Sequence, residues 1–226
     1  MSLEMIELEV RLPNGTRTSS SFSTKKPMAE VSCCMSNGGT REIVVPVRVG
    51  RVLIKEGIGL PKPEHEAFDA IHAVEARTCF TILTEMLSRR DHSVGEVRSK
   101  LSDYGFRCEE IEPAISRAIE MRFLNDERFA MHFIEERKHR GWGKRKIEIE
   151  LHRKGIDTAD LPGYPDEYFD DEEDLDRAVS LLNRKRIPDS HAYEKLVRRL
   201  MTKGFSFSIA SKAAHLKLSD IQDELF

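Results

Sequence analysis

The sequence predicts a mainly α-helical protein, in which three tandem three-helix repeats form an elongated curved array behind a small N-terminal β-rich module. Two observations carry this prediction. Apolar residues alternate at period two in the first 65 residues and follow a helical period afterwards. A helix-and-glycine pattern then recurs three times at near-equal spacing, as expected for stacked repeats.

The first predicted element is a half-buried strand near the N-terminus. Its apolar residues alternate with charged ones and are Ile6, Leu8, Val10 and Leu12. Asn14-Gly15 follows as a hairpin-type turn signal, since both residue types tolerate positive φ. The Ser/Thr-rich stretch 16–40 predicts weak strands and loop.

A second β signal spans residues 43–54, where β-branched residues suit a pleated surface and Pro46 and Gly50 mark an edge or bend. The Gly- and Pro-rich segment 57–63 is predicted to end the module and to act as a linker. The N-terminal domain is therefore placed at residues 1–65.

From about Phe68 the apolar residues follow a helical period. One predicted buried face consists of Ala76, Phe80, Leu83 and Leu87. Ser93 and Glu96 form a capping-box pattern that begins a second helix, and Gly105 supplies its left-handed end. A third helix covers about 109–122, with Pro113 expected near its first turn. Asn125 is predicted to cap the next helix, which starts at Asp126.

This unit repeats along the chain. Val97-x3-Leu101-x3-Gly105-Phe106 recurs at Ile147–Ile156 and at Leu196–Phe205. The two apolar residues predict a core stripe, the glycine a left-handed cap, and the last apolar residue a plug on the helix end. The predicted repeats are residues 66–125, 126–170 and 171–226, and the third helix of the second repeat is cut short by residues 161–165.

Charge is strongly segregated on a chain whose net charge is only −3. Residues 137–146 hold six Lys/Arg and no acid, whereas residues 166–176 hold eight Asp/Glu and no base. Because a local field follows local charge, the acidic average does not exclude a face that binds phosphates.

Several function classes lack their sequence signatures. The cysteines form no C-x-x-C pair, His132 and Glu136 lack a third metal ligand, and the Gly141–Lys144 stretch is no P-loop. We therefore expect no enzyme, cofactor or metal. The acidic start and the lack of a long apolar run predict a cytoplasmic protein.

Four stretches resemble the RecX family of recombinase regulators. They are Phe123–Ala130, Arg140–Ile147, Leu151–Ile156 and Arg198–Ser206, within a resemblance that covers about residues 73–218. The resemblance implies a monomeric modulator, not an enzyme, that lies along the groove of the RecA filament and its single-stranded DNA. It also implies reduced RecA ATPase and strand exchange.

Basic residues around the Gly-Trp-Gly turn are the predicted contact site, together with two arginines of the third repeat. Cations there suit phosphates or acidic protein, and the indole suits stacking or anchoring. The alternative is a solvated charge run with an inward-packed tryptophan. The predicted contact residues are Arg137, Lys138, Arg140, Trp142, Lys144, Arg145, Lys146, Arg153, Arg198 and Arg199.

A helix-turn-helix protein that binds duplex DNA is the competing hypothesis, because a three-helix unit with a glycine turn resembles that motif. The candidate recognition helix of repeat one opens with Glu109, Glu110 and Glu112, whose charge opposes phosphates. Repeat three, with Ser208, Ser211, Lys212 and His215, fits this hypothesis better.

Overall fold

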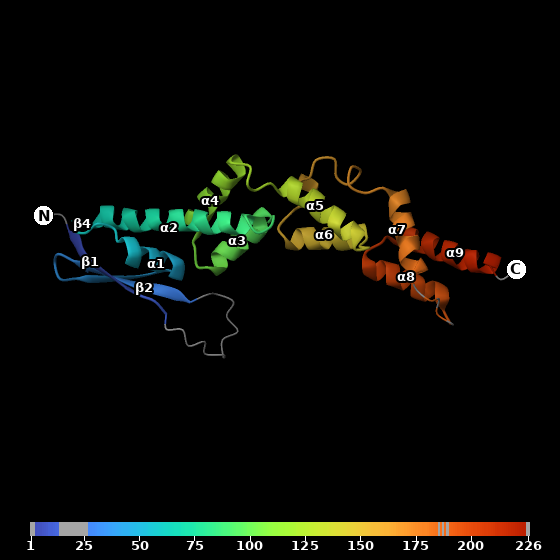
Figure 1. Ribbon diagram of the computed structural model, residues 1–226, viewed down its shortest axis with the longest axis horizontal. Coiled ribbons are helices and arrows are strands. Elements are labelled where there is room, and N and C mark those ends of the chain that lie inside the picture. The colour runs from blue at the N-terminus through green and yellow to red at the C-terminus, as the bar shows by residue number, and fades with distance from the viewer. Residues whose placement is uncertain (1–2, 14–26, 185, 187, 189, 225–226) are drawn as a thin grey trace. The chain divides into compact units, whose positions relative to one another are not determined.

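The computed structural model describes residues 3–13, 27–184, 186, 188 and 190–224. These residues form a mainly helical protein with a small antiparallel sheet and nine α-helices (Figure 1). The chain divides into two compact units, Met1–Leu124 and Asn125–Phe226, here called unit 1 and unit 2. The predicted Asn14-Gly15 turn lies outside the described residues.

Unit 1 opens with four strands in the order β3-β2-β1-β4. They are β1 (Glu4–Arg11), β2 (Met28–Met35), β3 (Thr40–Pro46) and β4 (Lys62–Pro63). The predicted first strand is confirmed, and Leu8 and Val10 pack on the core as predicted. Ile6 does not, because the register shifts between Met5 and Glu7. Met5 is fully buried while Ile6 is 50% exposed, so a bulge moves Ile6 off the core face.

The prediction of strand beyond Pro46 is wrong, because Val47–Glu56 forms helix α1. Pro46 stands at the N-cap, and the buried residues Val49 and Leu53 are one helical turn apart. Gly50 faces β2, where an added Cβ would lie 2.7 Å from the Cβ of Ala29. Packing on the sheet therefore overrides the β propensity of the valines.

Three helices follow: α2 (Glu64–Leu87), α3 (Val94–Asp103) and α4 (Cys108–Glu120). The segment 57–63 does not separate two cores, since β4 pairs with β1 and α2 begins directly after it. One hydrophobic cluster runs from the sheet through α1 to α4. The structure thus groups the predicted β module with the first predicted repeat.

The buried face of α2 differs from the predicted stripe. Ala76 is exposed and Phe80 is half-buried beneath the guanidinium of Arg117, whereas Leu83 is buried as predicted. Burial instead follows Ile71, Val74, Cys79 and Ile82. Pro113 lies in the second turn of α4, later than predicted.

The predicted capping box of α3 is confirmed. The amide of Glu96 donates to Ser93 Oγ at 3.1 Å, and the amide of Ser93 donates to Glu96 Oε2 at 3.4 Å.

Ser93→Ala is therefore expected to lower the free energy of unfolding of unit 1 by about 1 kcal/mol, since a buried cap acceptor is lost. Ser102→Ala, at an exposed position of the same helix, serves as the control and is expected to change little. Urea unfolding followed by circular dichroism measures both, and equal stability of the two variants would contradict the capping role.

Unit 2 holds α5 (Asp126–His139), α6 (Lys144–Arg153), a 3-10 turn η1 (Thr158–Asp160), α7 (Asp171–Asn183), α8 (Ala192–Lys203) and α9 (Phe207–Glu224). The predicted cap of α5 is confirmed, since Asn125 Oδ1 accepts the amide of Arg128 at 2.7 Å. One hydrophobic cluster joins α5, α6 and the chain after them, and another joins α7, α8 and α9.

The same glycine cap ends three helices, α3, α6 and α8. Gly105, Gly155 and Gly204 have φ of +93°, +78° and +96°. In each, the next residue donates its amide to the carbonyl five residues earlier, at 3.2 Å for Phe106, 3.0 Å for Ile156 and 3.1 Å for Phe205. These three apolar residues are buried, so the predicted cap and plug are confirmed.

Candidate interaction site

The Gly-Trp-Gly turn joins α5 to α6 and follows the same cap chemistry. Gly141 has φ +74°, and the amide of Trp142 donates to the carbonyl of Arg137 at 3.0 Å. Gly143 then stands at the N-cap of α6 with ordinary φ of −89°.

This turn is docked against the end of α8. The amide of Gly143 donates to the carbonyl of Lys203 at 2.9 Å, and the amide of Arg145 donates to the carbonyl of Gly204 at 3.0 Å. A Cβ on Gly143 would lie 2.3 Å from the backbone nitrogen of Phe205. The amides of Gly143 and Arg145 are thus bonded within the protein, and the end of α8 covers this helix start as an anion site.

Trp142 lies between two cations. The guanidinium of Arg137 is 4.9 Å from an indole ring centroid, and Lys146 Nζ is 4.2 Å from it. The half-buried indole also packs on the core cluster of α5 and α6. This placement favours the inward-packed alternative for Trp142 over stacking on a base.

Three predicted contact cations lie against aromatic rings of unit 2. Arg137 covers Phe133 at 4.5 Å, and only 19% of its side chain is exposed. Lys138 is buried and bonds Glu135 at 2.8 Å. Lys144 Nζ lies 5.7 Å from the ring of Tyr164. These contacts give the three side chains a packing role.

Two further predicted cations are exposed but form local ion pairs, Arg140 with Glu136 and Arg153 with Glu150. Exposed pairs of this kind contribute little to stability, but Glu136 and Glu150 each balance the charge of the guanidinium group beside them.

The remaining predicted cations form no ion pair within the described part of the chain. Arg145 is exposed, and its backbone lies against the end of α8. Arg198 and Arg199 lie on one face of α8, where two lysines at helical spacing join them around a shallow depression. We call this set the α8 basic face: Lys195, Arg198, Arg199 and Lys203. Arg198 and Arg199 are predicted contact residues, and the helical spacing places Lys195 on the same face of α8.

Three polar groups inside unit 2 have raised pKa values, Tyr164, Tyr168 and Asp174, and two of them form side-chain contacts that explain their place. Burial raises the pKa of Asp174, although Arg177 pairs with it. Burial also raises the pKa of Tyr164, whose hydroxyl donates to Glu148 at 2.7 Å. Asp174 pairs within α7, and Tyr164 ties the turn after η1 to α6.

Unit 1 holds one group of potential metal ligands among the described residues: His72, Glu75 and Glu110. The guanidinium of Arg107 lies 3.2 Å from Glu75 Oε2 and 2.6 Å from Glu110 Oε1. An internal cation therefore already occupies the position that a metal ion would take.

The buried thiols are poor nucleophiles, because burial raises the pKa of Cys33 and raises that of Cys79 to about 12. Within the described ranges, no helix combines the length and apolar character needed to cross a membrane.

Comparison with known proteins gives the site its context. Residues 79–117 match the model of the first three-helix domain of RecX, and residues 125–160 match that of the second. A protein from Vibrio vulnificus named "Regulatory protein RecX" is 32% identical over 132 residues, which cover 58% of this chain and 86% of that protein. The chain belongs to the RecX family. A RecX relative from Caldanaerobacter subterraneus is 26% identical over 72% of this chain and 81% of its own length.

Solved RecX structures share the fold. The crystal structure of RecX from Lactobacillus salivarius matches with a TM-score of 0.55 at 23% identity, over 62% of this chain and 94% of that one. A second RecX crystal structure, also at TM-score 0.55, is 17% identical and covers 92% of this chain and 96% of its own. That second alignment extends beyond the stretch in which the sequence motifs lie.

Proposed function

We propose that this regulatory protein binds the RecA–DNA filament and lowers its ATPase and recombination activity. Membership of the RecX family, with relatives named regulatory proteins, supports a regulatory role. We also propose that the chain contains three repeats of one unit, each with one glycine-capped helix, and that the filament contact is built along them. The repeats are α2–α4, α5 and α6 with η1, and α7–α9.

The α8 basic face is the observation that carries the proposed contact. Its four cations lie on one helix face, and none forms an ion pair with a described carboxylate. Uncompensated cations at a surface attract phosphates and acidic protein, and the attraction weakens with salt. A filament of protein and nucleic acid offers both kinds of partner.

Titration of the protein into a RecA–single-stranded-DNA ATPase assay tests the proposal. The wild-type chain is expected to inhibit near stoichiometric amounts, and Arg198→Glu/Arg199→Glu is expected to need at least about tenfold more protein, since two attractive contacts become repulsive. The matched variant is Arg140→Glu/Arg153→Glu, whose cations are held in ion pairs; a shift below about threefold is expected there.

Two outcomes would overturn the proposal at different levels. A wild-type chain that leaves ATPase unchanged would refute the function. An Arg198→Glu/Arg199→Glu variant that inhibits as well as wild type would refute the site while leaving the function standing.

The helix-turn-helix hypothesis is less well supported by the geometry of α9. Ser211 Oγ lies 2.9 Å from the hydroxyl of Tyr193, and the ring of His215 is 4.8 Å from the ring of Tyr193. Two of the four residues proposed for duplex contact are thus engaged within unit 2. Salt-resistant binding of a defined duplex without any effect on RecA would favour this alternative.

A further inference from the structure

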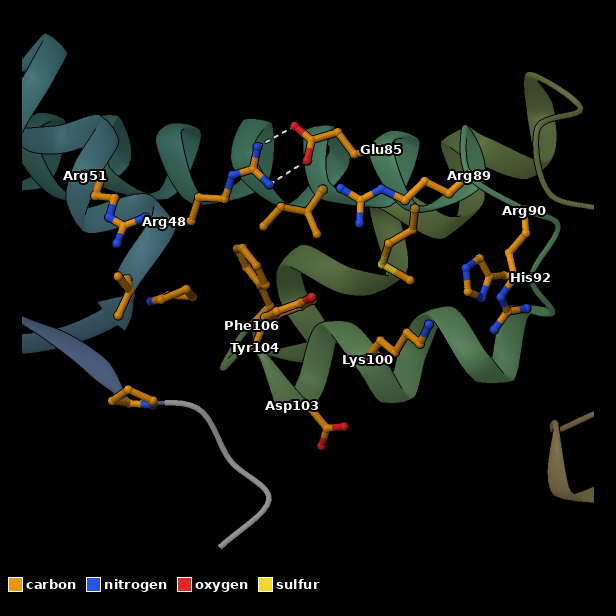
Figure 2. A pocket seen from close by; sticks show the side chains of 15 residues that line it. Arg48, Arg51, Glu85, Arg89, Arg90, His92, Lys100, Asp103, Tyr104 and Phe106 are labelled. Carbon is orange, nitrogen blue, oxygen red and sulfur yellow. Dashed lines mark hydrogen bonds and ion pairs between the residues drawn. The ribbon is translucent and has the colours of Figure 1, made fainter. Parts of the chain in front are cut away.

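Unit 1 contains a cleft of about 750 Å³ that the proposed filament contact does not use (Figure 2). Its walls come from α1, from the C-terminal part of α2 with the turn after it, and from α3. Its volume falls in the range of ligand-binding pockets. Three elements that are distant in sequence therefore enclose one space.

The cleft is strongly cationic. Five basic residues line it, against the two carboxylates Glu85 and Asp103, a net charge of +3. The basic residues are Arg48, Arg51, Arg89, Arg90 and Lys100. His92 adds no charge near neutral pH, because burial, and then Arg90 and Lys100, lower its pKa.

Part of this charge has no internal counter-charge. Arg48 forms a two-bond pair with Glu85, and Arg90 bonds Glu96 at 3.2 Å. Arg51, Arg89 and Lys100 form no ion pair with any described residue. Figure 2 shows Arg51 on the α1 side, Arg89 beside α2 and Lys100 on α3. Cations converge here from three elements, as in a site for a ligand with more than one negative charge.

The cleft also has an apolar floor. It consists of Ile82, Met86, Tyr104 and Phe106, of which Tyr104 is half-buried. An aromatic face beside cations suits a nucleobase attached to a phosphate backbone, since every base has a face that can stack.

An acidic peptide is a weaker fit. The extended segments that line the cleft contribute Pro27 and Pro46. Proline has no amide hydrogen, so neither residue can donate a backbone bond to a peptide added as a strand. Arginine side chains, by contrast, bind phosphates through their forked guanidinium groups.

We propose that this cleft is a binding site for the phosphate backbone of single-stranded nucleic acid, independent of the recombinase and of the α8 basic face. Arg51, Arg89 and Lys100 hold the phosphates, and Tyr104 supports a base. The site lies wholly in unit 1, so it gives the protein a second contact with nucleic acid beyond the proposed filament contact.

Fluorescence anisotropy of a labelled oligothymidylate, with the full-length chain and no recombinase, tests the cleft. The Arg198→Glu/Arg199→Glu variant is the background, so that the α8 basic face does not contribute. In it, Arg51→Glu/Arg89→Glu is expected to weaken binding at least about tenfold, and to flatten the slope of log K against log salt by about 1.4, because each single-strand phosphate contact contributes about 0.7.

Lys55→Glu is the matched control, since Lys55 is exposed on the same helix as Arg51 but does not line the cleft. It is expected to bind within about twofold of the background. Arg51 and Arg89 are both exposed, so their variants are expected to keep the circular dichroism melt of the parent.

Three results would overturn the proposal. The first is no oligonucleotide binding by the background variant, and the second is equal binding by Arg51→Glu/Arg89→Glu and Lys55→Glu. The third is an Arg51→Glu/Arg89→Glu variant that keeps oligonucleotide binding but loses binding to a labelled poly-glutamate, which would assign the cleft to an acidic protein. Because no recombinase is present, failure here leaves the ATPase result untouched.

Discussion

Gly143→Ala is expected to destabilise unit 2 by about 2 kcal/mol, within the cost of overpacking a close contact. The φ of Gly143 is −89°, which any residue adopts, so the whole cost comes from contact. A Cβ there would lie 2.3 Å from the nitrogen of Phe205 and 2.4 Å from the carbonyl carbon of Gly204. Both neighbours are backbone atoms, so relief requires α6 to move away from α8 and lose two hydrogen bonds.

Two other glycines separate contact from backbone strain. Gly57 has φ +63° and ψ −172°, a conformation that essentially only glycine adopts, and a Cβ added to it would meet nothing within 4 Å. Gly57→Ala is therefore expected to cost about 2 kcal/mol from strain alone. Gly204 has φ +96°, and a Cβ added to it would lie 2.6 Å from the nitrogen of Lys146. Gly204→Ala is therefore expected to cost about 3 kcal/mol, because strain and contact act together.

Urea unfolding measures the series. Trp142 is the single tryptophan of the chain and lies in the docked turn, so its fluorescence reports unit 2, while circular dichroism reports Gly57→Ala. A Gly143→Ala variant no less stable than wild type would refute the close docking of α6 on α8.

The features that the sequence predicts best are those that depend on short-range interactions along the chain. A capping box, an N-cap asparagine and a glycine cap each depend on residues a few positions apart, and Ser93, Asn125 and Gly204 all behave as predicted. The segment after Pro46 failed because its valines favour strand locally, while Gly50 lets a helix lie on β2. That contact joins residues far apart in the sequence, so local propensity does not reveal it.

The candidate site shows the same division. A run of cations is visible in sequence, but burial decides their roles, and Arg137 and Lys138 pack inward while Arg145 stays exposed. The cleft of unit 1 has no local signal, since its cations come from α1, α2 and α3 and only the fold brings them together.

Arg107→Met is expected to lower the free energy of unfolding of unit 1 by about 2 kcal/mol at neutral pH. The guanidinium of Arg107 joins Glu75 and Glu110, whose side chains are only 6% and 5% exposed. Removal of one partner from a buried ion pair costs about 3–5 kcal/mol. The smaller value is expected because 54% of the Arg107 side chain is exposed and water screens its charge.

The loss is expected to depend on pH, through Glu75. Burial raises the pKa of Glu75 above its ordinary 4.5, while His72 and Arg107 oppose the rise, so the variant raises it further. A carboxyl group whose pKa is higher in the folded state stabilises the fold fully below its unfolded pKa, and this contribution is lost as pH rises through the folded pKa. The deficit of Arg107→Met is therefore smaller at about pH 4.5 than at about pH 7.5 in urea unfolding.

Arg98→Met, which breaks the exposed pair with Glu112, is the control and is expected to cost about 0.5 kcal/mol at both pH values. An Arg107→Met deficit that is equal at the two pH values would show that Glu75 does not depend on Arg107 for its charge.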